Sequence, residues 1–134
     1  MITNIQANRI LDFNFGASSY SATSPLYIGL STTSVNNDGS GYTEPSGNAY
    51  ARVSVTNNKT TWTTASGSAL ANAIQISFPE SSGSWGTITH IFIADALSGG
   101  VVLFFDALTS SRTVPANTTV YFAIGNITVS MPNT

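Results

Sequence analysis

Apolar and polar residues alternate in short runs along much of this chain, and residues 86–108 contain its strongest hairpin signal. Two runs rich in β-branched and aromatic residues flank the sequence Leu-Ser-Gly-Gly, a pattern typical of an antiparallel hairpin. Strict alternation in the first arm predicts one face formed by Ile88, His90, Phe92 and Ala94, and another formed by Thr89, Ile91, Ile93 and Asp95. In the second arm it opposes Val101, Leu103 and Phe105 to Val102, Phe104 and Asp106. Both faces are apolar near their middles, so we expect the rest of the domain to cover one, and a helix or a neighbouring subunit the other.

Other short runs with a period of two predict further strands. We expect these strands at residues 26–31, 49–56, 60–64, 72–78, 118–124 and 126–131, with Gly125 as a bulge or bend within one long C-terminal strand. The cleanest alternation, over residues 49–56, points Arg52 outward. Residues 65–71 and 109–117 are predicted as loops, as is the long polar stretch 32–48. The pattern favours an all-β fold, namely one antiparallel β-sandwich or jelly-roll-like domain of about eight strands.

The N-terminal segment has the only helical signals. Residues 3–15 have a candidate N-cap at Thr3 or Asn4, and Gly16 is a suitable end for a helix. The apolar stripe of this helix is narrow and consists of Ala7, Ile10 and Leu11. We therefore expect residues 1–16 to form a short helix whose stripe docks on the sheet; the alternative is an extended arm that packs on a neighbouring subunit.

Composition narrows the classes of function. The 134 residues suit a single domain, and four basic and six acidic side chains make up only 7% of them, against roughly 25% in typical soluble domains. So few charges produce only a weak electrostatic field, which argues against nucleic-acid binding. No apolar run is long enough to cross a bilayer. We expect no signal peptide, and without cysteine there is neither a disulfide nor a thiolate metal site. A surface of Ser, Thr, Asn and Gly suits contact with protein or carbohydrate, because few charges need desolvation.

No residue pattern predicts a reaction. His90, the only histidine, stands inside a predicted strand, where a core or subunit-interface imidazole is the usual role. Asp95 alternates onto the opposite face, so no catalytic triad follows, and the carboxylates show no glycosidase-type pairing. Residues 36–40 faintly resemble a calcium loop but lack the EF-hand spacing and its terminal glutamate, although a cation held between subunits stays open. We expect no catalytic residue, no cofactor and no metal site.

Aromatic and apolar side chains outside a single core are the candidates for contacts with other proteins or with sugars. Tyr42, in the long polar loop, is the best single candidate for an exposed anchor, whereas core packing is the default for Trp62 and Trp85. The predicted interface residues are Ile91, Ile93, Val102, Phe104, Phe13, Phe15, Tyr42 and Trp62. Residues 91–95 carry more apolar side chains than a single covered face needs. We therefore predict that the chain forms a homo-oligomer, and that this oligomer is a trimer.

Five runs stand in a characteristic order along the chain. They are LYIGLST (26–32), YAR (50–52), ISFP (76–79), WGTITH (85–90) and GNITV (125–129). In this order they resemble a family of small tailed-bacteriophage virion proteins that are often labelled phage tail fiber protein. The resemblance extends from the N-terminal segment to Met131 and brings no active-site residue with it. It implies a virion component that is assembled in the cytoplasm of the infected bacterium.

Two places in a virion are open to such a protein. A tail fibre normally needs an attachment region, an elongated shaft and a tip, whereas this chain has no shaft repeat or linker. We therefore expect a non-enzymatic capsid cement or decoration protein on the head surface, which binds the major capsid protein between capsomers and stabilises the head. The alternative is a tail fibre or other tail-associated module that binds other tail proteins, a host receptor or a glycan. An enzyme is the third class, and we do not expect one.

Overall fold

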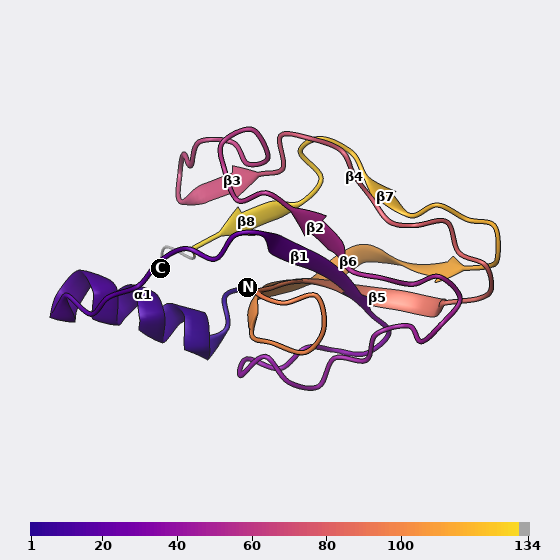
Figure 1. Cartoon of the computed structure of the whole chain (residues 1–134), viewed down its shortest axis with the longest axis horizontal. Helices are drawn as coiled ribbons and strands as arrows, with labels where there is room; N and C mark the ends of the chain where they lie inside the picture. The colour runs from indigo at the N-terminus through magenta and orange to yellow at the C-terminus, as the bar shows by residue number, and fades with distance from the viewer. Residues whose placement is uncertain (132–134) are drawn as a thin grey trace.

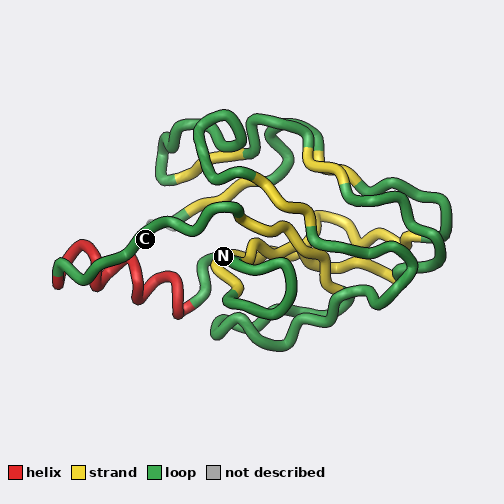
Figure 2. Tube along the Cα trace, viewed as in Figure 1, coloured by secondary structure: helices red, strands yellow, loops and turns green. Residues whose placement is uncertain are grey.

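The computed structural model describes residues 1–131 and shows a mostly β chain with one N-terminal helix (Figures 1 and 2). The elements in chain order are α1 (Asn4–Gly16), β1 (Leu26–Ser31), β2 (Val53–Val55), β3 (Ala69–Ala71), β4 (Ile76–Ser77), β5 (Gly86–Ala94), β6 (Val102–Val114), β7 (Tyr121–Phe122) and β8 (Thr128–Ser130). An antiparallel four-stranded sheet has the order β2-β1-β5-β6, and two antiparallel pairs join β3 to β8 and β4 to β7. The predicted antiparallel β class is confirmed at this level, and the sandwich or jelly-roll arrangement stays a prediction.

The predicted hairpin forms half of the larger sheet. β5 pairs with β6, with Phe92 opposite Phe105. Strict alternation along β5 is wrong at its start, because the pairing register shifts between Ile88 and His90. Ile88 therefore packs in the same cluster as Ile93, on the side away from Phe92.

β6 is longer and less regular than predicted. It runs through residues 109–114, which we expected to be a loop, and its end pairs with the beginning of β5. A second register shift, between Ile93 and Ala94, lets Val102 share a cluster with Phe105 although the two are three residues apart. The pairing partner there moves from Phe104 to Val102, so one extra residue on β6 reverses the faces beyond it.

The two faces of the hairpin carry separate apolar clusters. The larger lies between the four-stranded sheet and the two small sheets (Figure 1). Its buried members are Ile28, Leu30, Val55, Trp62, Ile76, Phe78, Trp85, Ile88, Ile93, Val114 and Ile127. The smaller cluster is formed by Val35, Phe92, Ala94, Val102 and Phe105, with Tyr42 packed against it. The second face is thus covered by the long loop of residues 32–52, and not by the helix or neighbouring subunit that we expected.

The smaller cluster depends on a glycine in the neighbouring strand. Gly29 lies opposite Phe92 in the β1–β5 ladder, and a Cβ built on Gly29 would stand 2.2 Å from Cζ of the Phe92 ring. The ring therefore occupies the space that any other residue at position 29 would need. Tyr42 also packs against this ring, with the two centroids 4.8 Å apart.

Arg52 fastens the long loop to the hairpin. Its guanidinium is buried, pairs with the Glu44 carboxylate at 2.8 Å, and lies 5.0 Å from the centroid of the Phe92 ring. It also donates to the carbonyl oxygens of Ala96 and Gly99 in the hairpin turn. Burial opposes the charge of Arg52, but the hydrogen bond and the attraction from Glu44 outweigh burial and raise the pKa of Arg52 above its ordinary value.

The prediction that Arg52 points outward is wrong because the strand it was assigned to is shorter. Asn48 and Ala49 have left-handed φ values of 53° and 64°, so the chain turns there and β2 begins only at Val53. Tyr50 lies in the same turn and donates its hydroxyl hydrogen to Glu44 at 2.7 Å. Burial is the main reason that the pKa of Tyr50 is raised above its ordinary value.

Asn72 joins the two small sheets. Its side chain is fully buried, donates to the carbonyls of Ile74 and Ala123, and accepts from the amide of Ile127. The prediction of one C-terminal strand is wrong, because the chain turns at Gly125 (φ +83°) and its two halves enter different sheets. The Gly125 amide donates to the backbone carbonyl of Asn72, so the same residue also fixes this turn.

The other predicted strands near these sheets are also shorter than expected. Residues 60–64 contribute only an isolated bridge between Trp62 and Asn72, and residues 72–78 contribute the two-residue β4. Residues 65–71, predicted as a loop, contain β3. Its small residues Ala-Leu-Ala give little strand signal, so the pairing with β8 decides the structure there.

The helix begins and ends near its predicted bounds. Thr3 is the N-cap and accepts from the amide of Gln6, and the chain leaves the helix through Ala17 in the left-handed region. The segment before the helix pairs with β6: Ile2 forms a bridge to Phe104, and the Thr3 hydroxyl donates to the carbonyl of Val102 at 2.7 Å.

The prediction that the apolar stripe of the helix docks on the sheet is wrong for Leu11, the last residue of the stripe. The buried residue of α1 is Gln6, whose side-chain amide donates to the Tyr20 hydroxyl at 2.8 Å, whereas Leu11 is exposed. The helix is held at its first turns and projects away from the sheets (Figure 1).

Candidate interaction site

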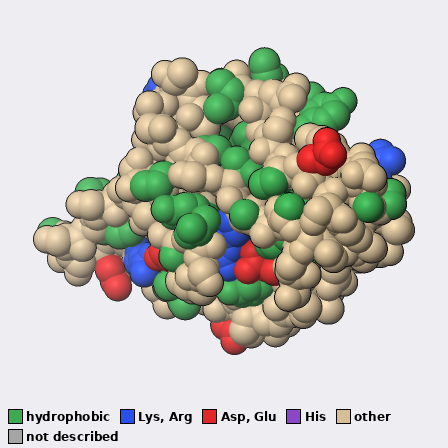
Figure 3. All heavy atoms as spheres, turned by 45° about the vertical axis from the view of Figure 1, so that its right-hand side comes forward, with side chains coloured by type: hydrophobic (Ala, Val, Ile, Leu, Met, Phe, Trp, Pro, Cys, Tyr) green, Lys and Arg blue, Asp and Glu red, His purple; other side chains and the backbone are tan. Residues whose placement is uncertain are grey.

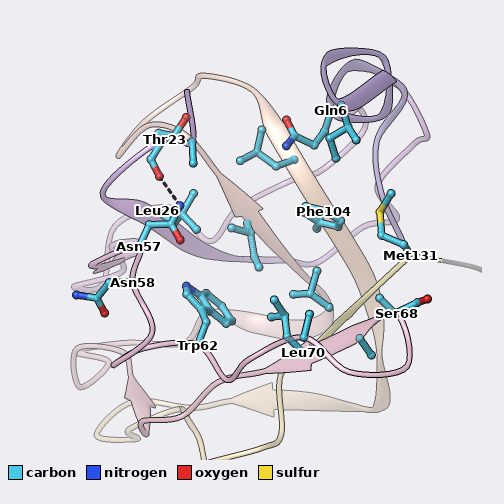
Figure 4. A pocket seen from close by; sticks show the side chains of 18 of the residues that line it. Gln6, Thr23, Leu26, Asn57, Asn58, Trp62, Ser68, Leu70, Phe104 and Met131 are labelled. Atoms are coloured by element: carbon cyan, nitrogen blue, oxygen red, sulfur yellow. Dashed lines mark hydrogen bonds between the residues drawn. The ribbon is translucent and has the colours of Figure 1, made fainter. Parts of the chain in front are cut away.

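A mainly apolar cleft of about 690 Å³ lies between the start of α1 and the end of the sheets (Figure 4). It is lined by five parts of the chain: α1 and the segment after it, the start of β1, residues 57–70, the hairpin, and β8 with the residue that follows it. Side chains on different sides of the cleft include Gln6, Leu26, Trp62, Leu70, Phe104 and Met131. The volume lies within the range of roughly 300–1,000 Å³ that is usual for binding sites.

Trp62 gives this cleft an unused hydrogen-bond donor. The side chain is only 5% exposed, and no acceptor within residues 1–131 bonds its Nε1. Trp85, which is equally buried, donates its Nε1 hydrogen to the carbonyl of Asn48 at 2.8 Å. A buried donor without a partner costs about 1–3 kcal/mol, so an acceptor that reached Trp62 Nε1 after a small shift of the indole would be favoured.

The cleft holds little charge. Lys59 is the one charged residue in its described lining, and the Lys59 ammonium donates to the carbonyl of Thr63 at 3.0 Å. The remaining polar lining consists of amide and hydroxyl side chains, such as Asn57, which donates to the Thr23 carbonyl (Figure 4). An acid–base pair is therefore missing from the described lining, which suits a binding site better than a catalytic one.

The free end of α1 is the second unusual surface. Phe13 is 51% exposed, Phe15 86% and Leu11 54%, although aromatic and aliphatic side chains of this size are normally buried. The Asp12 carbonyl accepts from the amides of Ala17 and Ser18. The carbonyls that follow, in the last helical turn, have no partner inside a helix. Figure 3 shows apolar side chains on the projecting part of the molecule, with acidic and basic side chains at its base.

The predicted interface residues fall into separate places. Three of them, Ile93, Phe104 and Trp62, line the cleft, and Phe13 and Phe15 are exposed on α1. Ile91 is half-buried against the larger cluster, Val102 is inside the smaller one, and Tyr42 is half-buried over Phe92. Ile93 and Val102 are inside because the chain's own segments cover both faces of the hairpin. Whether any of these residues contacts a partner stays a prediction.

Sequence reasoning missed the cleft itself. Its lining includes Ile10, Leu26, Leu70 and Leu103, which no local period connects. The signals present in the sequence were an aromatic residue among threonines, at Trp62, and apolar residues on the small strands. Neither signal shows that these side chains face a common space.

The residues considered for catalysis are dispersed. His90 is half-buried, with Nδ1 2.9 Å from the hydroxyl of the adjacent Thr89. Asp95 accepts from the amide of Val101 and lies 3.9 Å from the Arg9 guanidinium. A search of residues 1–131 finds no group of three or more His, Cys, Asp or Glu side chains that could hold a metal ion.

The calcium-like stretch is a self-contained turn. Asp38 accepts from both the hydroxyl and the backbone amide of Ser40, and these two bonds hold the pKa of Asp38 below its ordinary value. The Asn36 side chain also donates to the Ser40 hydroxyl. The polar atoms of this stretch thus bond one another. Within residues 1–131, no helix has both the length and the apolar character that a membrane span requires.

A comparison with known protein families matches residues 1–130 to the family described as podophage GP4 fiber I protein gp80. The chain belongs to this gp80 family. A search of curated proteins finds no match. The gp80 match confirms the resemblance to phage virion proteins labelled as fibre proteins, and it covers every element from α1 to β8. A phage virion protein of the fibre type is therefore the identity that both the sequence runs and the family comparison support.

Proposed function

We propose that this gp80-family chain is a non-enzymatic structural component of the phage virion and that it belongs to the fibre apparatus of the tail. The observation that carries the proposal is the family match over residues 1–130, whose description names a fibre protein. That description shifts the preference from the head, which we expected from the sequence, to a fibre. Partners would then be other tail proteins and further copies of the same chain.

The geometry supports a function in protein binding and not in catalysis. The described carboxylates and His90 form no catalytic arrangement, whereas the exposed end of α1 and the apolar cleft are both suited to protein contacts. Tyr42 is half-buried over Phe92 and Trp62 is buried, so these two residues form no open stacking platform for a sugar. We therefore propose a protein partner, and not a host glycan, as the main contact.

Capsid cement or decoration on the head is the second candidate. It is favoured by the shape of residues 1–131, whose four-stranded sheet and two small sheets pack around one larger cluster without a repeated shaft unit (Figure 1). In this role the chain would bind the major capsid protein between capsomers and stabilise the head. Such an interface normally buries more than ~1,000 Å² in total when it is stable.

Immunogold labelling of intact virions tests both candidates. Gold along tails is the expected result, and gold over the shell would replace the tail proposal with the cement proposal. Pull-downs of purified tails and of empty capsids with the tagged full chain provide an independent measurement. A chain that is absent from purified virions and binds neither particle would overturn the structural role itself.

A further inference from the structure

We propose that copies of this chain join head to tail, with the free end of α1 from one copy seated in the apolar cleft of the next. The proposal concerns the contact between copies and holds for a place on either the tail or the head. It assigns a shared role to two features that the fold leaves unexplained, namely the exposed helix end and the cleft.

The first argument is the reach of the helix. Gln6 and Ile10, in the first half of α1, line the cleft of their own copy, whereas Phe15 lies five residues beyond Ile10. A helix rises about 1.5 Å per residue, so Phe15 stands about 7–8 Å further along the axis, and Figure 1 shows this end pointing away from the sheets. A straight helix cannot bend its end back into the cleft that its beginning lines. Phe15 therefore cannot reach the cleft of its own copy, and a second copy is the occupant that we propose.

The second argument is hydrogen bonding. The Trp62 Nε1 is buried and has no acceptor within residues 1–131, and the side chain that carries it lines the cleft. The last turn of α1 offers backbone carbonyls without helical partners, since only the Asp12 carbonyl is taken up by the C-cap amides. An incoming helix end would thus bring acceptors next to the indole, which would bond one of them after a small shift that uncovers its Nε1, and its aromatic rings would fill the apolar space.

The third argument is charge. Lys59 is the one charged residue in the described lining. The C-terminal end of a helix carries a partial negative charge, and the Asp12 carboxylate adds a full negative charge about one turn before that end. The incoming surface and the cleft are therefore complementary in sign. A patch with only these charges also loses little hydration energy on burial.

The symmetry follows from the contact. Helix end and cleft are different surfaces, so the interface is heterologous, and repeated contacts close into a ring when the rotation between copies allows it. A ring of three would realise the trimer that we predicted from the sequence, although for a different reason. The apolar residues 91–95 are satisfied inside the chain, and α1 takes over as the contact element.

The chain has no cysteine, so single-cysteine variants of the full chain give a clean cross-linking test. Phe15→Cys marks the helix end, and Ala65→Cys marks an exposed position in the cleft lining. Under mild oxidation, a mixture of the two variants should give a disulfide-linked dimer that neither variant gives alone. The matched control replaces Phe15→Cys with Leu97→Cys, which is 59% exposed in the hairpin turn, and should give background linking. Linking of Phe15→Cys to itself, or no linking in the mixture, would overturn the head-to-tail contact.

Sedimentation gives a second measurement that does not depend on a disulfide. The unmodified chain should sediment as an oligomer at micromolar concentration, and the double variant Phe13→Ser/Phe15→Ser as a folded monomer. Leu97→Ser is the control for loss of exposed apolar area and should leave the oligomer intact. Trp62→Phe keeps the ring but removes the donor, and should weaken association by roughly 3- to 10-fold, the equivalent of one hydrogen bond. An unmodified chain that is monomeric, or a double variant that associates like the unmodified chain, contradicts the proposal.

These outcomes are distinguishable from failure of the proposed function. Labelling of virions reports where the chain is, whereas cross-linking and sedimentation report how copies join. A chain found on tails but monomeric in all assays would remove the helix-in-cleft contact and leave the virion role in place.

Discussion

The contact between Gly29 and Phe92 offers the sharpest test of the fold. In Gly29→Ala, the added Cβ would lie 2.2, 2.6 and 2.8 Å from three atoms of the Phe92 ring, whereas ordinary carbon contacts are about 3.5–4.0 Å. The ring would have to move by more than about 1 Å to restore that spacing. It has little room to do so, because Phe92 is fully buried and Tyr42 and Arg52 pack against it.

We expect Gly29→Ala to lower the free energy of unfolding by about 2–2.5 kcal/mol. Overpacking of a well-filled core typically costs 1–3 kcal/mol, and the close distances put this site at the upper end. Replacing a strand glycine returns about 0.5–1 kcal/mol, because alanine loses less backbone entropy on folding. At roughly 3–5 °C per kcal/mol for a domain of this size, the midpoint of thermal unfolding should fall by about 10 °C.

Urea titration and thermal unfolding, both followed by circular dichroism, provide the measurement. Gly16→Ala is the matched control, because a Cβ there meets only the Ser18 hydroxyl oxygen at 3.9 Å, and it should leave stability unchanged or raise it by up to about 1 kcal/mol. The double variant Gly29→Ala/Phe92→Leu should lose less than the sum of the two single variants, because the smaller side chain relieves the clash. A loss below about 0.5 kcal/mol for Gly29→Ala would show that the ring does not lie over position 29.

Three further substitutions test other parts of the structure by urea titration. Asn72→Ala should cost about 3 kcal/mol, because it leaves the Ile127 amide and two carbonyls unpaired; a cost under about 1 kcal/mol would contradict the bonding described. Arg52→Met should cost about 2–4 kcal/mol, since it leaves the Glu44 carboxylate without its cation, and Glu44→Gln should cost a similar amount, since it leaves the buried Arg52 guanidinium without its anion. Phe105→Ala should cost about 3–5 kcal/mol because the ring is 7% exposed, and a surface-like value below about 1 kcal/mol would place it outside the smaller cluster.

The features that the sequence predicted correctly depend on residues close together in the chain. The hairpin turn contains Gly99 and Gly100, both with positive φ, and glycine adopts this conformation without steric cost. The N-cap at Thr3 and the strand at residues 26–31 likewise follow from short patterns. Local chemistry decides these features, so a single sequence is enough to predict them.

The errors arose where long-range contacts decide the structure. The alternation over residues 49–56 was real in the sequence, but its first half is a turn, and Arg52 is buried by its pairing with Glu44. The long loop covers Phe92 through Val35 and Tyr42, and a polar loop sequence gives no sign of such a role. In both cases, the contacting residues lie too far apart in the sequence for any hydrophobic periodicity to connect them.

The candidate site shows the same division. That Phe13 and Phe15 would be available for contacts was predictable, because they lie beyond the narrow stripe of the helix. The cleft was not predictable, because it exists only when α1, the hairpin and β8 come together. The unpaired Nε1 of Trp62 was not predictable either. Tryptophan is usually buried, so burial could be expected, but the sequence does not show whether its N–H group finds an acceptor.

The buried amide of Asn72 also bears on how the molecule opens. Pairs of strands with two or three residues each are too short to be stable alone, and here both are bonded through one side chain. Neither pair can separate without exposing polar groups that the other relies on, so the two should behave as one cooperative unit in native-state hydrogen exchange. The amides of β3, β4, β7 and β8 would then share a single opening free energy, lower than that of the central β5–β6 ladder.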